Sequence, residues 1–81
     1  MIYPEQIRAA RALLGINQTR LAELADVGVA TVKRIEVATG EIRGAAQTIW
    51  KLQTALEREG VRFIDGDESG GIGVRLKRPS H

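Results

Sequence analysis

The residues best equipped for chemistry are amide and cationic side chains in the first half of the chain. Asn17 and Gln18 carry an amide pair, and Lys33 and Arg34 form a basic pair farther along. Amide and guanidinium groups are the side chains that read base edges and bind phosphate oxygens. The chemistry that these residues could perform is therefore contact with a nucleic acid.

Catalytic and metal-binding chemistry has little support in the sequence. The chain has no cysteine and one histidine, His81 at the last position, so we expect no disulfide, no thiolate metal site and no histidine-based catalysis. Asp65, Asp67 and Glu68 could suggest a cation site, but acidic residues in a glycine-rich turn are ordinary, and the spacing of a calcium loop is absent. We expect neither an enzyme nor a cofactor.

Residues 18–36 read as two short amphipathic helices separated by a turn. Asp26 falls in the turn, where a left-handed residue is often needed and Asp is tolerated. Ala22 is small where steeply crossing helices approach most closely, and Gly28 can begin the second helix as its N-cap. The apolar stripes comprise Leu21, Ala22, Leu24 and Ala25, then Val32 and Ile35, with Val27 between them. This pattern indicates a helix-turn-helix, which offers its second helix to the major groove of DNA.

Flanking helices complete the expected bundle. Pro4 suits the first helical position of a helix that ends at Gly15, although Tyr3 is a poor N-cap that leaves this end open to fraying. Asn17 caps the next helix. A fourth helix is expected over residues 45–59. Its buried stripe comprises Ala45, Ile49, Leu52 and Leu56, with Trp50 off the stripe and Ile42 fixing the preceding loop to the core.

The last third of the chain predicts a β-hairpin. Residues 61–64 and 72–77 alternate at period two around an acidic, glycine-rich turn. Because an isolated hairpin is marginal and an unpaired edge invites another strand, we expect a homodimer, formed by hairpin pairing or by Trp50 and the hairpin packing across a two-fold axis. The expected dimerisation residues are Trp50, Phe63, Ile72, Val74 and Leu76. The alternative is a hairpin that folds back over its own helices.

The length and net charge of the chain limit its domain organisation and its possible partners. The 81 residues predict a helix-turn-helix part over residues 1–60, the hairpin over 61–78 and a disordered tail over 79–81, with a thin core. A net charge of +2 and a pI near 9.5 permit nucleic-acid binding without requiring it. The apolar runs are too short to span a membrane, and no signal pattern is evident, so we expect a cytoplasmic protein, at the nucleoid when bound to DNA.

The chain resembles the phage-repressor family of DNA-binding domains (the λ/434 repressor and Cro group, or XRE family) over roughly residues 4 to 59. The matching residues are Arg11, Leu14-Gly15-Ile16-Asn17-Gln18, Leu21-Ala22, Val27, Thr31-Val32 and Ile35-Glu36. The resemblance implies a mainly α fold, a four-to-five-helix bundle containing the helix-turn-helix, here followed by a hairpin. Simple members continue with a fifth helix, whereas a subset ends similarly to this chain, with GV-x-F followed by GVRL.

The resemblance also implies roles for particular residues. Arg11 and Glu36 would form a partly buried ion pair. Gln18 would contact the DNA backbone, with Asn17 and Thr19 as weaker candidates, and Arg43 would touch the backbone beside the groove. For each of these polar side chains, a purely structural or solvated role is the alternative.

The start of the second motif helix departs from the family pattern of polar side chains. Gly28, Val29 and Ala30 offer no side-chain hydrogen bond to a base, although the latter two could pack on thymine methyl groups. Lys33 would contact a phosphate, and Arg34 would be the principal base reader. An exposed basic pair can also be merely a solvated face.

The resulting hypothesis is a sequence-specific transcriptional regulator, acting as a repressor and binding an inverted-repeat operator on double-stranded DNA as a homodimer. RNA polymerase or another regulatory protein would be a further partner. The alternative is a protein-interaction module, such as an antiactivator or antitoxin-like subunit, on a helix-turn-helix scaffold with little base readout.

Overall fold

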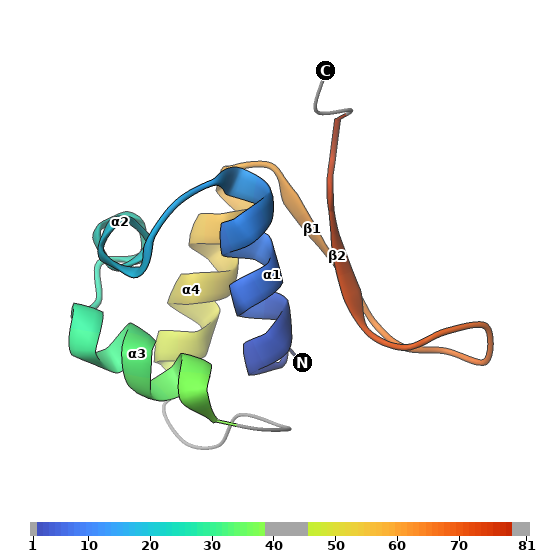
Figure 1. Ribbon diagram of the computed structural model, residues 1–81, viewed down its shortest axis with the longest axis horizontal. Helices are drawn as coiled ribbons and strands as arrows, with labels where there is room; N and C mark the ends of the chain where they lie inside the picture. The colour runs from blue at the N-terminus through green and yellow to red at the C-terminus, as the bar shows by residue number, and fades with distance from the viewer. Residues whose placement is uncertain (1, 39–45, 79–81) are drawn as a thin grey trace.

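The computed structural model describes residues 2–38 and 46–78, which form a mainly α fold of four helices and one two-stranded antiparallel sheet (Figure 1). The elements are α1 (Pro4–Leu14), α2 (Gln18–Ala25), α3 (Val29–Val37), α4 (Ala46–Arg58), β1 (Val61–Ile64) and β2 (Gly73–Leu76). The expected fold class is confirmed. The predictions made for Ile42, Arg43 and Ala45 and for the tail 79–81 lie outside the described residues.

Helices α1 and α4 separate two unlike sides of the molecule. Helices α2 and α3 lie on one side, and the hairpin lies on the other (Figure 1). The core is small and aliphatic, and its largest fully buried side chains are Ile7, Leu21, Val32, Leu52, Leu56 and Val61. Helix α2 packs on both α3 and α4, so the position of the helix-turn-helix is fixed by the same core that holds α4.

Two local signals set the ends of α1 and α2. Gly15, with φ of 68°, follows α1, and Asp26, with φ of 56°, follows α2. At each end two backbone bonds form a Schellman motif; after α2 they run from Val27 N to Ala22 O (3.0 Å) and from Asp26 N to Glu23 O (3.3 Å). The left-handed Asp26 therefore turns the chain sharply from α2 into α3.

The hairpin packs against its own helices. Val61 pairs with Leu76 and Phe63 with Val74, and opposite residues of a strand pair share one face of the sheet. Val61 is fully buried, and the other three are partly buried against the core. The hairpin thus folds back over the helices that precede it, an arrangement that uses its apolar face and is compatible with a dimer joined through a strand edge.

A buried glutamine, which sequence reasoning missed, joins α1 to the hairpin. Gln6 is 2% exposed, and its Nε2 donates to Ile64 O (3.1 Å) and to Gly73 O (3.0 Å). Its Oε1 accepts from Tyr3 N (2.8 Å), and Ile2 is buried nearby in the core cluster. Tyr3 makes no side-chain cap bond, as expected, and Gln6 supplies a capping bond that opposes the fraying expected at this end.

Replacing Gln6 by alanine is expected to release the hairpin selectively. The substitution leaves the Tyr3 amide without its acceptor and removes one of the bonds that the Ile64 and Gly73 carbonyls each accept, at a cost of about 2 kcal/mol. Amide hydrogen exchange in β1 and β2 should accelerate more than exchange in α2 and α4, because the hairpin becomes a local unfolding unit. The matched control is Gln47→Ala, at an exposed position of α4, and equal acceleration throughout the chain would contradict the expectation.

Candidate nucleic-acid interface

Helix α3 has one buried face and one exposed face. Val32, Ile35 and Glu36 are buried. The intervening positions are exposed: Val29, Ala30, Lys33 and Arg34. Residues three and four apart share a face of a helix, so the exposed set forms one continuous surface. Helix α3 lies across the α1–α4 pair from the hairpin (Figure 1), and we call its exposed surface, together with the N-cap Gly28, the α3 face.

The beginning of the α3 face is open and free of polar side chains. Gly28 is the N-cap, with φ of −73° and ψ of 147°, values that any residue adopts. Among the described residues, a Cβ added there would have Thr31 Oγ1, at 3.9 Å, as its one contact within 4 Å outside its chain neighbours. The fold of the chain therefore does not require glycine at this position, and the small residue leaves room for a close approach from outside.

The buried carboxylate of Glu36 joins the inner side of α3 to α1 through an ion pair. Glu36 is 3% exposed and pairs with Arg11, whose Nε lies 2.7 Å from Oε2 and whose Nη2 lies 2.7 Å from Oε1. Arg11 Nη1 also donates to Ile16 O (3.2 Å), and Arg8 donates to the Glu36 carbonyl. The hydrogen bond to Glu36 raises the pKa of Arg11 above its ordinary value, against the opposing effect of desolvation. The structure thus brings together the residues expected to form the ion pair.

Gln18 belongs to the same network. Its Nε2 donates to Glu36 Oε1 (3.0 Å), so this amide group faces α3 within the protein. Asn17 is the N-cap of α2, and its Oδ1 accepts from Arg20 N (2.8 Å). Thr19 is exposed at the first turn of α2. Among these three residues, therefore, the hydroxyl of Thr19 and the first backbone N–H groups of α2 are best placed to meet an anion.

Arg58, an exposed residue at the end of α4, joins α4 to α2. Its Nη2 donates to Leu24 O (3.3 Å), one of the carbonyls that a helix leaves unsatisfied in its last turn. The signal that could have found it is a cation near the end of α4, although no spacing rule connects that position to α2. Arg20, in contrast, pairs with Glu23 at 3.6 Å on an exposed surface.

The residues expected to dimerise fall into two groups. Trp50 and Ile72 are exposed, at 64% and 38%. Phe63, Val74 and Leu76 instead pack against the core of the same chain. Trp50 and Ile72 could therefore bury their side chains against a partner. The side chains of Phe63, Val74 and Leu76 are already used within the chain, so the strands could join a partner only through their backbone edge.

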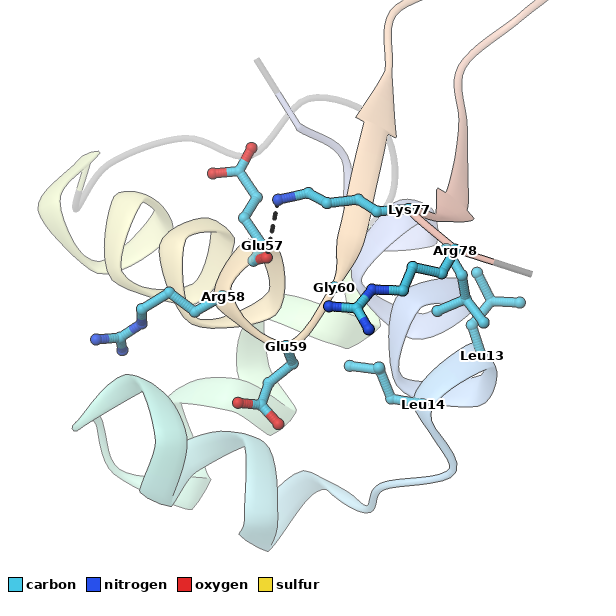
Figure 2. Close-up of a pocket in the computed structure, with 9 residues that line it drawn as sticks. Leu13, Leu14, Glu57, Arg58, Glu59, Gly60, Lys77 and Arg78 are labelled. Atoms are coloured by element: carbon cyan, nitrogen blue, oxygen red, sulfur yellow. Dashed lines mark hydrogen bonds between the residues drawn. The ribbon is translucent and has the colours of Figure 1, made fainter. Parts of the chain in front are cut away.

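An open cavity of about 640 Å³ lies where the ends of α1, α4 and β2 meet (Figure 2). Its described lining combines leucines with charged side chains: Leu13, Leu14, Glu57, Arg58, Glu59, Gly60, Leu76, Lys77 and Arg78. Lys77 crosses one side and donates from Nζ to Glu57 O (3.2 Å). None of these residues belongs to α2 or α3, so the cavity is separate from the α3 face.

No cluster of three or more His, Cys, Asp or Glu side chains is arranged to hold a metal ion in residues 2–38 and 46–78. Over the same ranges, no helix has the length and apolar character needed to cross a bilayer.

Comparison with known proteins agrees with this geometry. Residues 7–59, more than half of the chain, match the model of a helix-turn-helix family, whereas no curated protein matches the chain. A domain of this kind implies DNA as the partner and regulation of transcription as the role, and it is typical of non-enzymatic regulators. The chain belongs to the XRE/Cro/C1-type helix-turn-helix family.

Proposed function

We propose that this protein is a sequence-specific repressor that binds an inverted-repeat operator as a homodimer. The observation that carries the proposal is the exposed α3 face, whose inner side is fixed by Glu36 and whose outer side presents Lys33 and Arg34. A helix held in this way can enter a major groove without first being ordered, which reduces the entropic cost of binding.

Each residue of the α3 face has a proposed role. Arg34 reads a base, ideally a guanine through a bidentate contact, and Lys33 contacts a phosphate. Val29 and Ala30 pack on thymine methyl groups. Gly28 lets the backbone come close to the DNA, in keeping with the open space around it.

Backbone contacts from neighbouring segments would set the register on the duplex. Thr19 and the N-terminal amides of α2 face a phosphate, with Asn17 beside them. Gln18 is proposed to combine its bond to Glu36 with a second amide donor directed to the DNA, since an amide group carries two N–H donors. Arg43 remains a proposed backbone contact.

Repression would follow from occupancy of the promoter. A bound dimer occludes RNA polymerase, which, with another regulatory protein, is the proposed further partner. Two copies related by a two-fold axis match an inverted repeat. We place this action in the cytoplasm, at the nucleoid.

Selection from a random DNA pool tests the proposal. The full chain should enrich a palindromic motif, and the spacing between its half-sites reports the distance between the two α3 helices. Enrichment of a single half-site would contradict the homodimer, and the absence of any enriched motif would contradict sequence-specific binding.

Replacing Lys33 by alanine is expected to weaken binding to all sequences equally. A phosphate contact releases one counterion, so the slope of log affinity against log salt concentration should fall in magnitude by about 1. Lys51→Ala on α4 is the matched control and should leave the slope unchanged. An unchanged slope with the Lys33 variant would remove this residue from the interface.

One observation favours a second function. Gly28, Val29 and Ala30 place no hydrogen-bonding side chain at the start of the α3 face, which suits a protein partner, as in an antiactivator or antitoxin-like subunit. Binding through such a patch would depend weakly on salt, whereas DNA binding would weaken steeply as salt is added. A titration of DNA affinity against salt therefore separates the two functions.

A further inference from the structure

We propose that β2 is a self-pairing strand, through which two copies of the chain join edge to edge in antiparallel orientation. The inference deepens the proposed homodimer and rests on it. Strand β1 lies beside α4, whereas β2 is the strand farther from α4 (Figures 1 and 2). The sheet has the order β1-β2, so within residues 2–38 and 46–78 β2 has a strand neighbour on one edge only.

The hydrogen-bonding pattern identifies the groups on the open edge. Lys77 N donates to Gly60 O (2.8 Å), so this pair is hydrogen-bonded within the hairpin. In an antiparallel ladder, bonded and non-bonded pairs alternate. The N–H and C=O groups of Val74 and Leu76 therefore point away from β1. Over residues 2–38 and 46–78 these groups have no hydrogen-bond partner.

The residues of β2 select one register for the pairing. If Val74 faces Val74 of the second copy, Leu76 faces Ile72 and Arg75 faces Gly73. The exposed Ile72 then gains an apolar neighbour. A shift by one bonded pair in one direction would place Arg75 opposite Arg75 of the second copy, and Arg75 already lies opposite Arg62 in its own hairpin. A shift in the other direction would place Leu76 opposite Gly70, where Leu76 has no apolar neighbour. Like charges in direct opposition are destabilising, so the register centred on Val74 is favoured.

Charge along the hairpin complements the same arrangement. The acidic residues lie at its tip, as Asp65, Asp67 and Glu68, and basic residues follow β2, as Lys77 and Arg78. The tip is ordered by Asp67, whose Oδ1 accepts from Ser69 N (2.8 Å) and Gly70 N (3.2 Å). Antiparallel pairing centred on Val74 brings Arg78 of one copy level with Gly70 of the other. The acidic tip of each hairpin thus lies beside the basic end of its neighbour.

The packing on both sides of the extended sheet is compatible with this pairing. A two-fold axis perpendicular to the sheet places α1 of both copies on the same face. The exposed positions of α1 include Ala9 and Ala12, and small side chains let helices approach closely. On the opposite face Arg75 stands beside a glycine, where a long side chain has room.

Engineered disulfides test the register in a chain that has no cysteine of its own. Gly73 and Arg75 of different copies form a non-bonded pair, with a Cα separation of about 4.5 Å, which suits a disulfide. A Cβ at Gly73 would meet no atom of the described residues within 4 Å, its chain neighbours aside. The double variant Gly73→Cys/Arg75→Cys should therefore form a covalent dimer on mild oxidation, detected by intact mass without reductant.

The single variants are matched controls. Gly73→Cys alone and Arg75→Cys alone should remain uncrosslinked, because each would need a register shifted from Val74. Efficient crosslinking of either single variant, or none in the double variant, would overturn the proposal. In the wild type, amide exchange at Val74 and Leu76 should slow as the protein concentration rises, while Lys77 stays protected throughout. Exchange independent of concentration, with a monomer in sedimentation, would also overturn it.

The readouts separate this inference from the proposed function. A dimer that joins by another surface and still selects palindromic DNA would leave the repressor assignment standing and remove the role of β2. A crosslinked double variant that enriches no DNA motif would establish the β2 pairing and remove the repressor assignment.

Discussion

Replacing Glu36 by alanine is expected to lower the free energy of unfolding by about 3 kcal/mol. The carboxylate accepts two bonds from Arg11 and one from Gln18, and its loss leaves a guanidinium between α1 and α3 without its counter-charge. Arg11 is 21% exposed, so water can partly replace the carboxylate and the cost stays below that of a fully buried charge. In a domain of this size the midpoint of thermal unfolding should fall by roughly 12 to 24 °C.

An exposed ion pair supplies the control for this measurement. Glu23 pairs with Arg20, with side chains 63% and 56% exposed, and Glu23→Ala should change the free energy of unfolding by less than about 1 kcal/mol. Glu36→Gln should fall between the two, because it keeps an acceptor but not the charge. If Glu36→Ala and Glu23→Ala cost the same, the buried network does not hold α3.

The second large effect is expected from Arg34. If Arg34 makes a bidentate contact to one base, Arg34→Ala should cost about 1 to 3 kcal/mol of binding free energy on the selected operator, a loss of roughly 5- to 150-fold. The variant should also relax sequence preference at one position of each half-site. Fluorescence anisotropy with a series of single-base operator variants would measure both the affinity and the preference.

Two further variants distinguish base reading by Arg34 from a general effect of its positive charge. Arg62 is exposed on the hairpin, across the α1–α4 pair from α3 (Figure 1), so Arg62→Ala should leave the operator affinity nearly unchanged. Arg34→Lys keeps the charge but not the planar fork, and should retain affinity for non-specific DNA while losing discrimination. If Arg34→Ala weakens all sequences to the same extent, Arg34 contacts a phosphate instead.

The side chains on the α3 face limit how well the protein could distinguish one DNA sequence from another. In the proposed complex, side-chain hydrogen bonding to bases would fall mainly to Arg34, because Gly28, Val29 and Ala30 stand at the start of this face. Apolar contacts distinguish thymine by its methyl group and give less discrimination than a bidentate pair. We therefore expect a short half-site motif, in which the dimer supplies much of the selectivity by requiring two half-sites at a fixed spacing.

Local signals were sufficient to predict where the helices begin and end. Pro4 begins α1, Gly15 follows it, Asn17 caps α2 and Gly28 caps α3. Each of these effects operates within about one turn of the helix, so a few neighbouring residues determine it. The same holds for Asp26, whose left-handed backbone sets the turn of the helix-turn-helix.

Residues far apart in the sequence were harder to predict. Gln6 reads as a polar residue in the first turn of a helix, but its partners Ile64 and Gly73 are 58 and 67 residues away. Arg58 likewise finds its acceptor on α2 only after α4 has packed there. No sequence periodicity connects such positions, because these side-chain hydrogen bonds depend on how complete helices and strands pack together.

The sequence by itself determined the helix-turn-helix, the hairpin strands and the outward placement of Lys33 and Arg34, because periodicity and capping are properties of short segments. Tertiary packing decided which surface the hairpin covers and that the Gln18 amide donates to Glu36. Tertiary packing also decided that the apolar side chains of β1 and β2 pack against the core of the same chain. The physical reason is that burial and charge pairing are shared between elements, so the partner of each group is chosen only when the elements assemble.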